Sequence, residues 1–153
     1  MHRSKNSAVA VVKGGKDYPR LMGKVYFNQT PQGVLVTAQV SGLPVQNGAC
    51  PGVGGVFGFH IHTGEACTGT EINEFADALG HYNPNGCPHP YHAGDLPPLF
   101  SNNGSAYMSV LTNRFTLKEI LGKVVIIHGK PDDFTTQPSG NAGEMIACGK
   151  IVQ

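Results

Sequence analysis

The sequence predicts an all-β domain of the sandwich or barrel class. Its 153 residues include 21 glycines and 11 prolines, and only 14% are charged, which is a turn-rich composition. Apolar residues also alternate in several short segments, as Val34, Val36 and Val40 do within residues 33–41. Because successive side chains of a strand point to opposite faces, this alternation indicates half-buried strands.

Seven segments are bounded by Gly, Pro, Asn or Asp and have this strand character, so seven or eight short strands are expected. We expect these strands at residues 7–12, 21–28, 33–41, 56–62, 105–112, 123–128 and 146–152. Only residues 116–121 have a helical composition, with Thr116 as a candidate N-cap and Gly122 as a stop. Two long segments, 63–100 and 129–144, lack strand character, and loops of that length in a small domain usually carry a function.

Composition and charge exclude several classes of protein. A formal net charge of +1 excludes a broadly basic surface for nucleic acid, and the absence of Trp argues against stacking on bases. The longest apolar runs, residues 8–12 and 124–127, are too short to cross a membrane. One domain of this length can bury a sufficient core, so we treat residues 1–153 as a single domain with 1–6 as a tail.

The start of the chain leaves its compartment open. Residues 1–6 are basic, as at the start of a signal peptide, but the apolar stretch behind them ends at Lys13 after five residues. As it stands, the chain is expected to be cytoplasmic, or extracytoplasmic after removal of a leader.

Six of the seven histidines lie in the first long segment or at the strand ends that lead into the two loops. His60 and His62 flank Ile61 on an expected strand, so both imidazoles project from the same face. His128 follows the apolar run 124–127, at the end of another strand. These three side chains are candidate nitrogen ligands for a metal ion.

The remaining candidates follow one another in the first long segment. Within fifteen residues it contains His81, His89, His92 and Asp95. Three histidines and one aspartate form a credible tetrahedral zinc site, although neutral imidazole suits copper equally well. One His-x-His pair or one loop aspartate is commonly incidental, but the convergence of seven such residues predicts metal binding.

Several motifs carry a resemblance to a known family. They are Gly58-Phe-His-Ile-His, Gly80-His-Tyr-Asn-Pro, His92-Ala-Gly-Asp-Leu, Gly140-Asn-Ala-Gly and Ile-Ala-Cys148-Gly. In this order they resemble the copper/zinc superoxide dismutase family, from about Ala8 to the end. The resemblance implies an eight-stranded Greek-key sandwich or flattened barrel with two long functional loops, an architecture for which this family is a standard example.

The resemblance divides the ligands between two metals. It implies copper ligands at His60, His62, His81 and His128. It implies zinc ligands at His81, His89, His92 and Asp95. His81 would then be the shared, catalytic imidazole, which detaches from copper on reduction, takes up a proton and returns it. The implied cofactors are copper and zinc, and the implied substrate is superoxide.

The resemblance also implies an outer carboxylate and a disulfide. Asp132 matches an aspartate that links a copper-binding histidine to a zinc-binding one, here His60 and His89, without touching either metal. Cys67 and Cys148 match the family's disulfide between a loop and a strand. A cross-link that closes about eighty residues is worth roughly 4 to 5 kcal/mol in the chain-entropy description.

Cys50 and Cys87 lie outside the family pattern. Each precedes a proline in a turn, Gly-Ala-Cys-Pro or Gly-Cys-Pro, one before the His60 strand and one in the first long loop. We predict a second bridge between them, with two free thiols as the alternative.

Met145 is the main departure from the family. The family has an arginine here, which lines the channel to copper; Ser139 is placed in the same channel. Methionine carries no charge and donates no hydrogen bond, and Glu144 lies beside it. We therefore expect weaker attraction of superoxide and a reduced rate, unless Lys130, the only cation of residues 129–144, replaces the arginine.

Three functions are weighed. An enzyme would convert superoxide to dioxygen and hydrogen peroxide by alternate reduction and oxidation of copper. A non-enzymatic copper- or zinc-binding protein or carrier of the same fold is favoured by Met145, but such a protein would be expected to have lost a ligand, and all seven are present. A zinc hydrolase would need a general base beside an open zinc position, and none is evident. The chain is expected to be a monomer or a homodimer, with a copper donor that the sequence does not specify.

Overall fold

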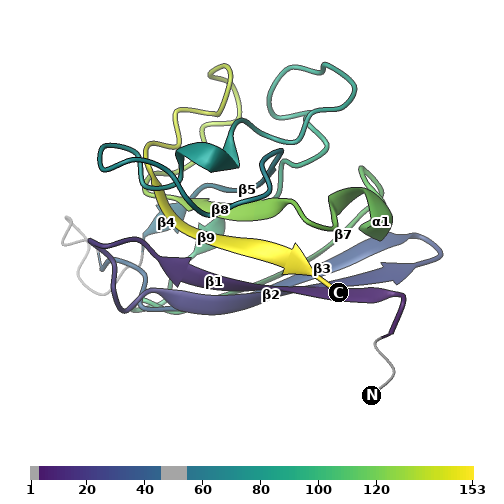
Figure 1. Cartoon of the computed structure of the whole chain (residues 1–153), viewed down its shortest axis with the longest axis horizontal. Coiled ribbons are helices and arrows are strands. Elements are labelled where there is room, and N and C mark those ends of the chain that lie inside the picture. Colours follow the sequence, from purple (N-terminus) through teal and green to yellow (C-terminus); the bar gives the residue numbers. More distant parts are fainter. Residues whose placement is uncertain (1–3, 46–54) are drawn as a thin grey trace.

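The computed structural model describes residues 4–45 and 55–153, which are mostly strands and loops (Figure 1). The strands are β1 (Ser7–Gly14), β2 (Met22–Thr30), β3 (Gly33–Ser41), β4 (Val56–Phe57), β5 (Phe59–His62), β6 (Leu99–Phe100), β7 (Ala106–Thr112), β8 (Val124–His128) and β9 (Met145–Val152). The described residues also form two short helices, η1 (Ala76–Ala78) and α1 (Leu117–Ile120). The predicted all-β class is confirmed.

Seven strands form one antiparallel sheet in the order β5-β8-β9-β1-β2-β3-β7, and β4 pairs with β6. The sheet curls into a half-barrel, with β1, β2 and β3 on one wall and β5 and β8 on the other (Figure 1). β3 lies beside β7, and β9 returns to lie beside β1, so strands far apart in the sequence become neighbours. This crossing pattern fits the predicted Greek key.

Two expected elements differ from the structure. The expected strand at residues 56–62 breaks at Gly58 into β4, which pairs with β6, and β5, which pairs with β8. A Cβ atom at Gly58 would lie 2.8 Å from that of Ala142, so glycine allows the second long loop to pack closely at the break. The end of the expected loop 63–100 forms β6. With the break at Gly58, the seven predicted segments become nine strands in the described part of the chain.

The interior of the half-barrel is an apolar core supplied by alternate strand positions. On β3, Val34, Val36 and Val40 are buried, whereas Leu35 is 38% exposed. β8 departs from this pattern because all five of its residues are buried. One face of β8 packs on the core and the other is covered by loops.

A second apolar cluster lies under these loops. Val124 and Ile126 of β8 pack there with Cys148 of β9 and with Phe75 and Ala78 of the first long loop. The cluster attaches this loop to the outer face of the sheet, beside the histidines of β5 and β8. This outer layer carries the candidate site.

The structure contains the predicted disulfide between Cys67 in the first long loop and Cys148 in β9. Cys50 lies outside the described residues, so its pairing with Cys87 stays a prediction.

Removing the disulfide should destabilise the protein without altering its strand pattern. The bond joins residues 81 positions apart, and a loop of this length corresponds to roughly 4 to 5 kcal/mol of unfolding free energy. We expect the double variant Cys67→Ser/Cys148→Ser to lose about this amount in urea denaturation. A loss below about 1 kcal/mol would contradict the chain-entropy argument.

Candidate metal centre

The two long loops bring the predicted ligands together on the outer face of β5 and β8. The first loop returns alongside the free edge of β5, so that His81 pairs with His62 and Asp95 with His60 in isolated β-bridges. The Ile61 N–H donates to Gly94 O at 2.8 Å, and a Cβ at Gly94 would lie only 2.3 Å from Ile61 O. Glycine is therefore required where the loop meets the strand.

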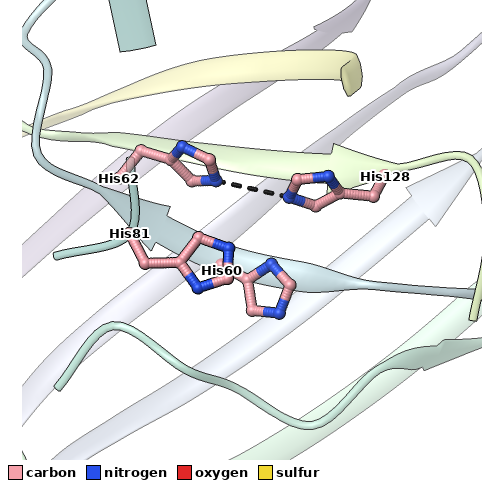
Figure 2. Close-up of side chains that lie close together, drawn as sticks. All are labelled: His60, His62, His81 and His128. Carbon is pink, nitrogen blue, oxygen red and sulfur yellow. Dashed lines mark hydrogen bonds between the residues drawn. The ribbon is translucent and has the colours of Figure 1, made fainter. Parts of the chain in front are cut away.

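Four imidazoles form the first ligand group. One ring nitrogen from each lies within 4.8 Å of the other three, and the residues are His60, His62, His81 and His128. Figure 2 shows the His62 and His128 rings facing each other, and their Nε2 atoms are 3.3 Å apart. The Nδ1–H groups of the same two rings face carbonyl oxygens, at 2.7 Å to Leu79 and 3.3 Å to Gly143.

These contacts test whether the group fits a metal ion. With Nδ1 protonated, neutral His62 and His128 direct two Nε2 lone pairs at each other, an arrangement that needs a cation or a proton between them. His60 Nδ1 and His81 Nε2 are also buried without a hydrogen-bond partner among the described residues. The donor set therefore fits a metal that prefers imidazole, such as copper.

Burial favours the neutral form of His60, His62 and His128. It lowers the pKa of His60 to about 4, although the hydrogen bond to Asp132 acts in the opposite direction. Burial also lowers the pKa of His128 to about 3 and places the pKa of His62 well below its usual value. Since only a neutral imidazole can bind a metal ion, the fold prepares the ligands before the ion arrives.

A second group lies on the other side of His81. His81 Nδ1 is 2.9 Å from Asp95 Oδ1 and 3.1 Å from His92 Nδ1, and His89 Nδ1 is 3.0 Å from Asp95 Oδ2. His60 lies close to this group as well. One of its ring nitrogens is within 4.8 Å of ligand atoms of His81, His89 and Asp95. Zinc bonds of 2.0–2.1 Å in a tetrahedron place ligand atoms about 3.3 Å apart, close to these distances.

The second group also fits a cation. His89 Nε2 binds the Asp132 carboxylate, so its Nδ1 faces the Asp95 carboxylate as a lone pair, and no hydrogen bond satisfies that nitrogen among the described residues. Burial by itself raises the pKa of Asp95, but the hydrogen bond from His81 and the nearby imidazoles outweigh it and lower the pKa. Asp95 therefore stays anionic, as a zinc ligand must.

Asp132 joins the two groups. Its Oδ2 accepts from His60 Nε2 at 2.7 Å and its Oδ1 from His89 Nε2 at 2.8 Å. Burial opposes ionisation, but these hydrogen bonds and one from the Phe134 N–H hold the pKa of Asp132 well below its usual range. Gly140 (φ +74°) packs against this carboxylate, and a Cβ there would lie 1.9 Å from Oδ1.

The described residues include two supporting side chains that the sequence analysis missed. Arg114, between β7 and α1, donates from Nη1 to the carbonyl oxygens of Pro90 at 2.8 Å and His92 at 3.3 Å. The Gln137 side-chain amide forms two 2.8 Å hydrogen bonds with the backbone of His89. No local sequence pattern signals such contacts, because their partners are 22 to 48 residues away.

The predicted channel residues lie together. Met145 is paired with His128 in the β8–β9 register. Met145 and Ser139 line one cavity of about 610 Å³, which also reaches His62, His81 and His128. The first ligand group is therefore open to small molecules on this side.

Comparison with known proteins identifies the family, because the family profile for copper/zinc superoxide dismutase matches residues 21–151. The chain belongs to the copper/zinc superoxide dismutase family. It is 38% identical over 141 residues to a Cu-Zn superoxide dismutase of Legionella pneumophila, covering 87% of this chain and 79% of that protein. A Photobacterium leiognathi enzyme of the same name is 35% identical over 144 residues, with coverages of 85% and 78%.

A third relative, Cu-Zn superoxide dismutase 2 of Aquifex aeolicus, is 34% identical over 146 residues, covering 86% of this chain and 79% of the relative. The family consists of oxidoreductases that use copper and zinc. In the described part of the chain, no helix has the length and apolarity needed to span a membrane.

Arg114 should be a positioning residue for the second ligand group. Because its guanidinium holds the backbone on both sides of Tyr91, Arg114→Ala should loosen His89 and His92 and weaken zinc binding about 10- to 100-fold. Competition with a chromogenic chelator measures this change. Arg20→Ala, which removes another exposed arginine, is the control and should retain native affinity; equal affinities for all three proteins would contradict the assignment.

Proposed function

We propose that this protein is a copper/zinc superoxide dismutase, converting superoxide to dioxygen and hydrogen peroxide. The observation that carries the proposal is the position of His81 between two buried ligand groups. Its Nδ1 faces Asp95 and His92. Its Nε2 is buried beside the other imidazoles and has no hydrogen-bond partner in the part of the chain that the structure describes. One imidazole can therefore serve two metal ions.

The proposed sites use all seven candidate ligands. Copper would be held by His60, His62, His81 and His128. Zinc would be held by His81, His89, His92 and Asp95. Bound copper would supply one-electron redox chemistry, and bound zinc, which is redox-silent, would fix the geometry of the shared imidazole.

Residues of the chain would handle proton transfer, ligand orientation and substrate access. His81 Nε2 is suited to take up a proton and return it, since this atom has no hydrogen-bond partner in residues 4–45 and 55–153. Asp132 fixes the orientation of the His60 and His89 rings through their Nε2 atoms. The loops cover His89, which is 2% exposed, while His62 and His128 reach the cavity. Substrate would therefore approach from the copper side.

A non-enzymatic copper- or zinc-binding protein of the same fold is the second candidate. Met145 favours it, because the cavity lacks the arginine expected at this position. The complete ligand set favours the enzyme.

Protein loaded with both metals should contain one copper and one zinc per chain, with His81 between them. Metal analysis with anomalous scattering at both absorption edges measures this. His128→Ala should lose copper and keep zinc, and Asp95→Ala should do the reverse, because His128 belongs to the first ligand group and Asp95 to the second. Two ions of one kind in the doubly loaded protein would contradict the division of ligands.

Met145→Arg should raise the rate constant for superoxide. The new guanidinium would line the cavity beside His128, and electrostatic steering, for which this family is a standard example, changes association rates by about 10- to 10³-fold. We expect an increase on the order of tenfold at low salt, and a gain over the native protein that shrinks as ionic strength rises, because salt screens the added charge. Pulse radiolysis measures both effects, with Met145→Leu as the uncharged control.

The alternative for Met145 is that Lys130 acts in place of the arginine. Lys130 is exposed, its stem packs beside Gly143, and it is not among the cavity-lining residues of the described chain. Lys130→Ala should therefore leave the rate nearly unchanged. A large loss in Lys130→Ala, together with no gain in Met145→Arg, would overturn this interpretation.

A further inference from the structure

The cavity that reaches His62, His81 and His128 of the first ligand group has an acidic lining. Among the residues that the structure describes, it contains one cationic side chain, Lys16. It contains four carboxylates, from Asp17, Glu71, Glu74 and Glu144. They come from the β1–β2 turn, the first long loop and the residue before β9, so only the folded chain collects them around one opening.

Lys16 does not neutralise this lining. Its ammonium group lies 3.4 Å from the carbonyl oxygen of Glu71, and the contacts with Glu74 come from the Lys16 backbone N–H, at 3.0 and 2.9 Å. None of the four carboxylates has a cationic side chain within 4 Å in the described part of the chain. The lining therefore keeps a surplus of negative charge.

Among these carboxylates, Glu144 is the one next to Met145 in the sequence. It precedes Met145, and its carboxylate accepts a hydrogen bond from the Tyr18 hydroxyl at 2.8 Å. Glu144 is exposed, and this contact holds its carboxylate beside Tyr18, another residue that lines the cavity. Uncharged Met145 stands next to it, so no positive charge at that position offsets Glu144.

A ligand position lies within the same cavity. His81 lines it, the His81 side chain is 4% exposed, and its Nε2 has no hydrogen-bond partner among the described residues. His62 and His128 line it as well. A small molecule that reaches these imidazoles through this cavity passes the acidic lining.

We propose that this lining selects against anions, with Glu144 as the residue that determines the selectivity. The inference rests on the proposed function, for which superoxide is the anion concerned. Bound metal ions would add positive charge at the imidazoles, but equally in every variant with an intact ligand set. Salt screens the repulsion between the lining and an anion, with a screening length of about 10 Å at 0.1 M. The rate constant of the native protein for superoxide should therefore rise with ionic strength.

Azide, a stable monoanion, tests the selectivity without turnover. Protein loaded with copper and zinc is titrated with azide at low and high concentrations of sodium perchlorate, and binding is followed in the visible spectrum of copper. Native affinity should increase with salt. Glu144→Gln should bind azide about two- to fivefold more tightly at low salt and depend less on salt, as removal of one nearby charge requires.

Glu65→Gln is the matched control, because Glu65 is exposed on the first long loop but does not line the cavity. It should behave like the native protein. Native azide affinity that falls with salt, or equal effects of Glu144→Gln and Glu65→Gln, would overturn the proposal.

The rate constant for superoxide, measured on the same samples, separates the two proposals. Dismutation whose rate falls with salt would refute the selectivity and keep the enzyme. The expected azide pattern without dismutation would support the selectivity and refute the proposed activity.

Discussion

The candidate metal centre depends on the buried Asp132 carboxylate, which accepts hydrogen bonds from two imidazoles. One oxygen of Asp132 binds His60 on β5 and the other binds His89 in the first long loop. A buried carboxylate is costly unless its oxygens are satisfied, and these two rings satisfy them. The same two bonds leave one unprotonated nitrogen on each ring facing a ligand group. Asp132 thus connects the sheet, both long loops and both sides of the centre.

The environment of the centre also determines its protonation. Burial favours neutral imidazoles, whereas hydrogen bonds from imidazoles favour ionised Asp95 and Asp132. Neutral histidine and anionic aspartate are the forms that bind metal ions. Burial alone would leave unprotonated ring nitrogens with their lone pairs facing one another. Bound cations would satisfy these lone pairs.

The long loops that carry the ligands are attached at several places. A disulfide joins the first loop to β9, Arg114 binds its carbonyl groups, and Gln137 connects it to the second loop. A loop of this length would otherwise have too much conformational freedom to hold ligand atoms within a few tenths of an ångström. The β-sheet supplies the rigid base, because β8 is buried on both faces.

The sequence by itself determined the strand-rich class, the common face of His60 and His62, and the full set of ligand types, because period-two alternation and residue chemistry are local properties. The resemblance added the two-metal division and the disulfide. Only the tertiary structure decided that the strand at residues 56–62 breaks at Gly58, that Arg114 holds the first long loop, and that carboxylates from three segments line the cavity. Each of these depends on contacts between residues far apart in the chain, and a local pattern contains no information about which distant groups will meet.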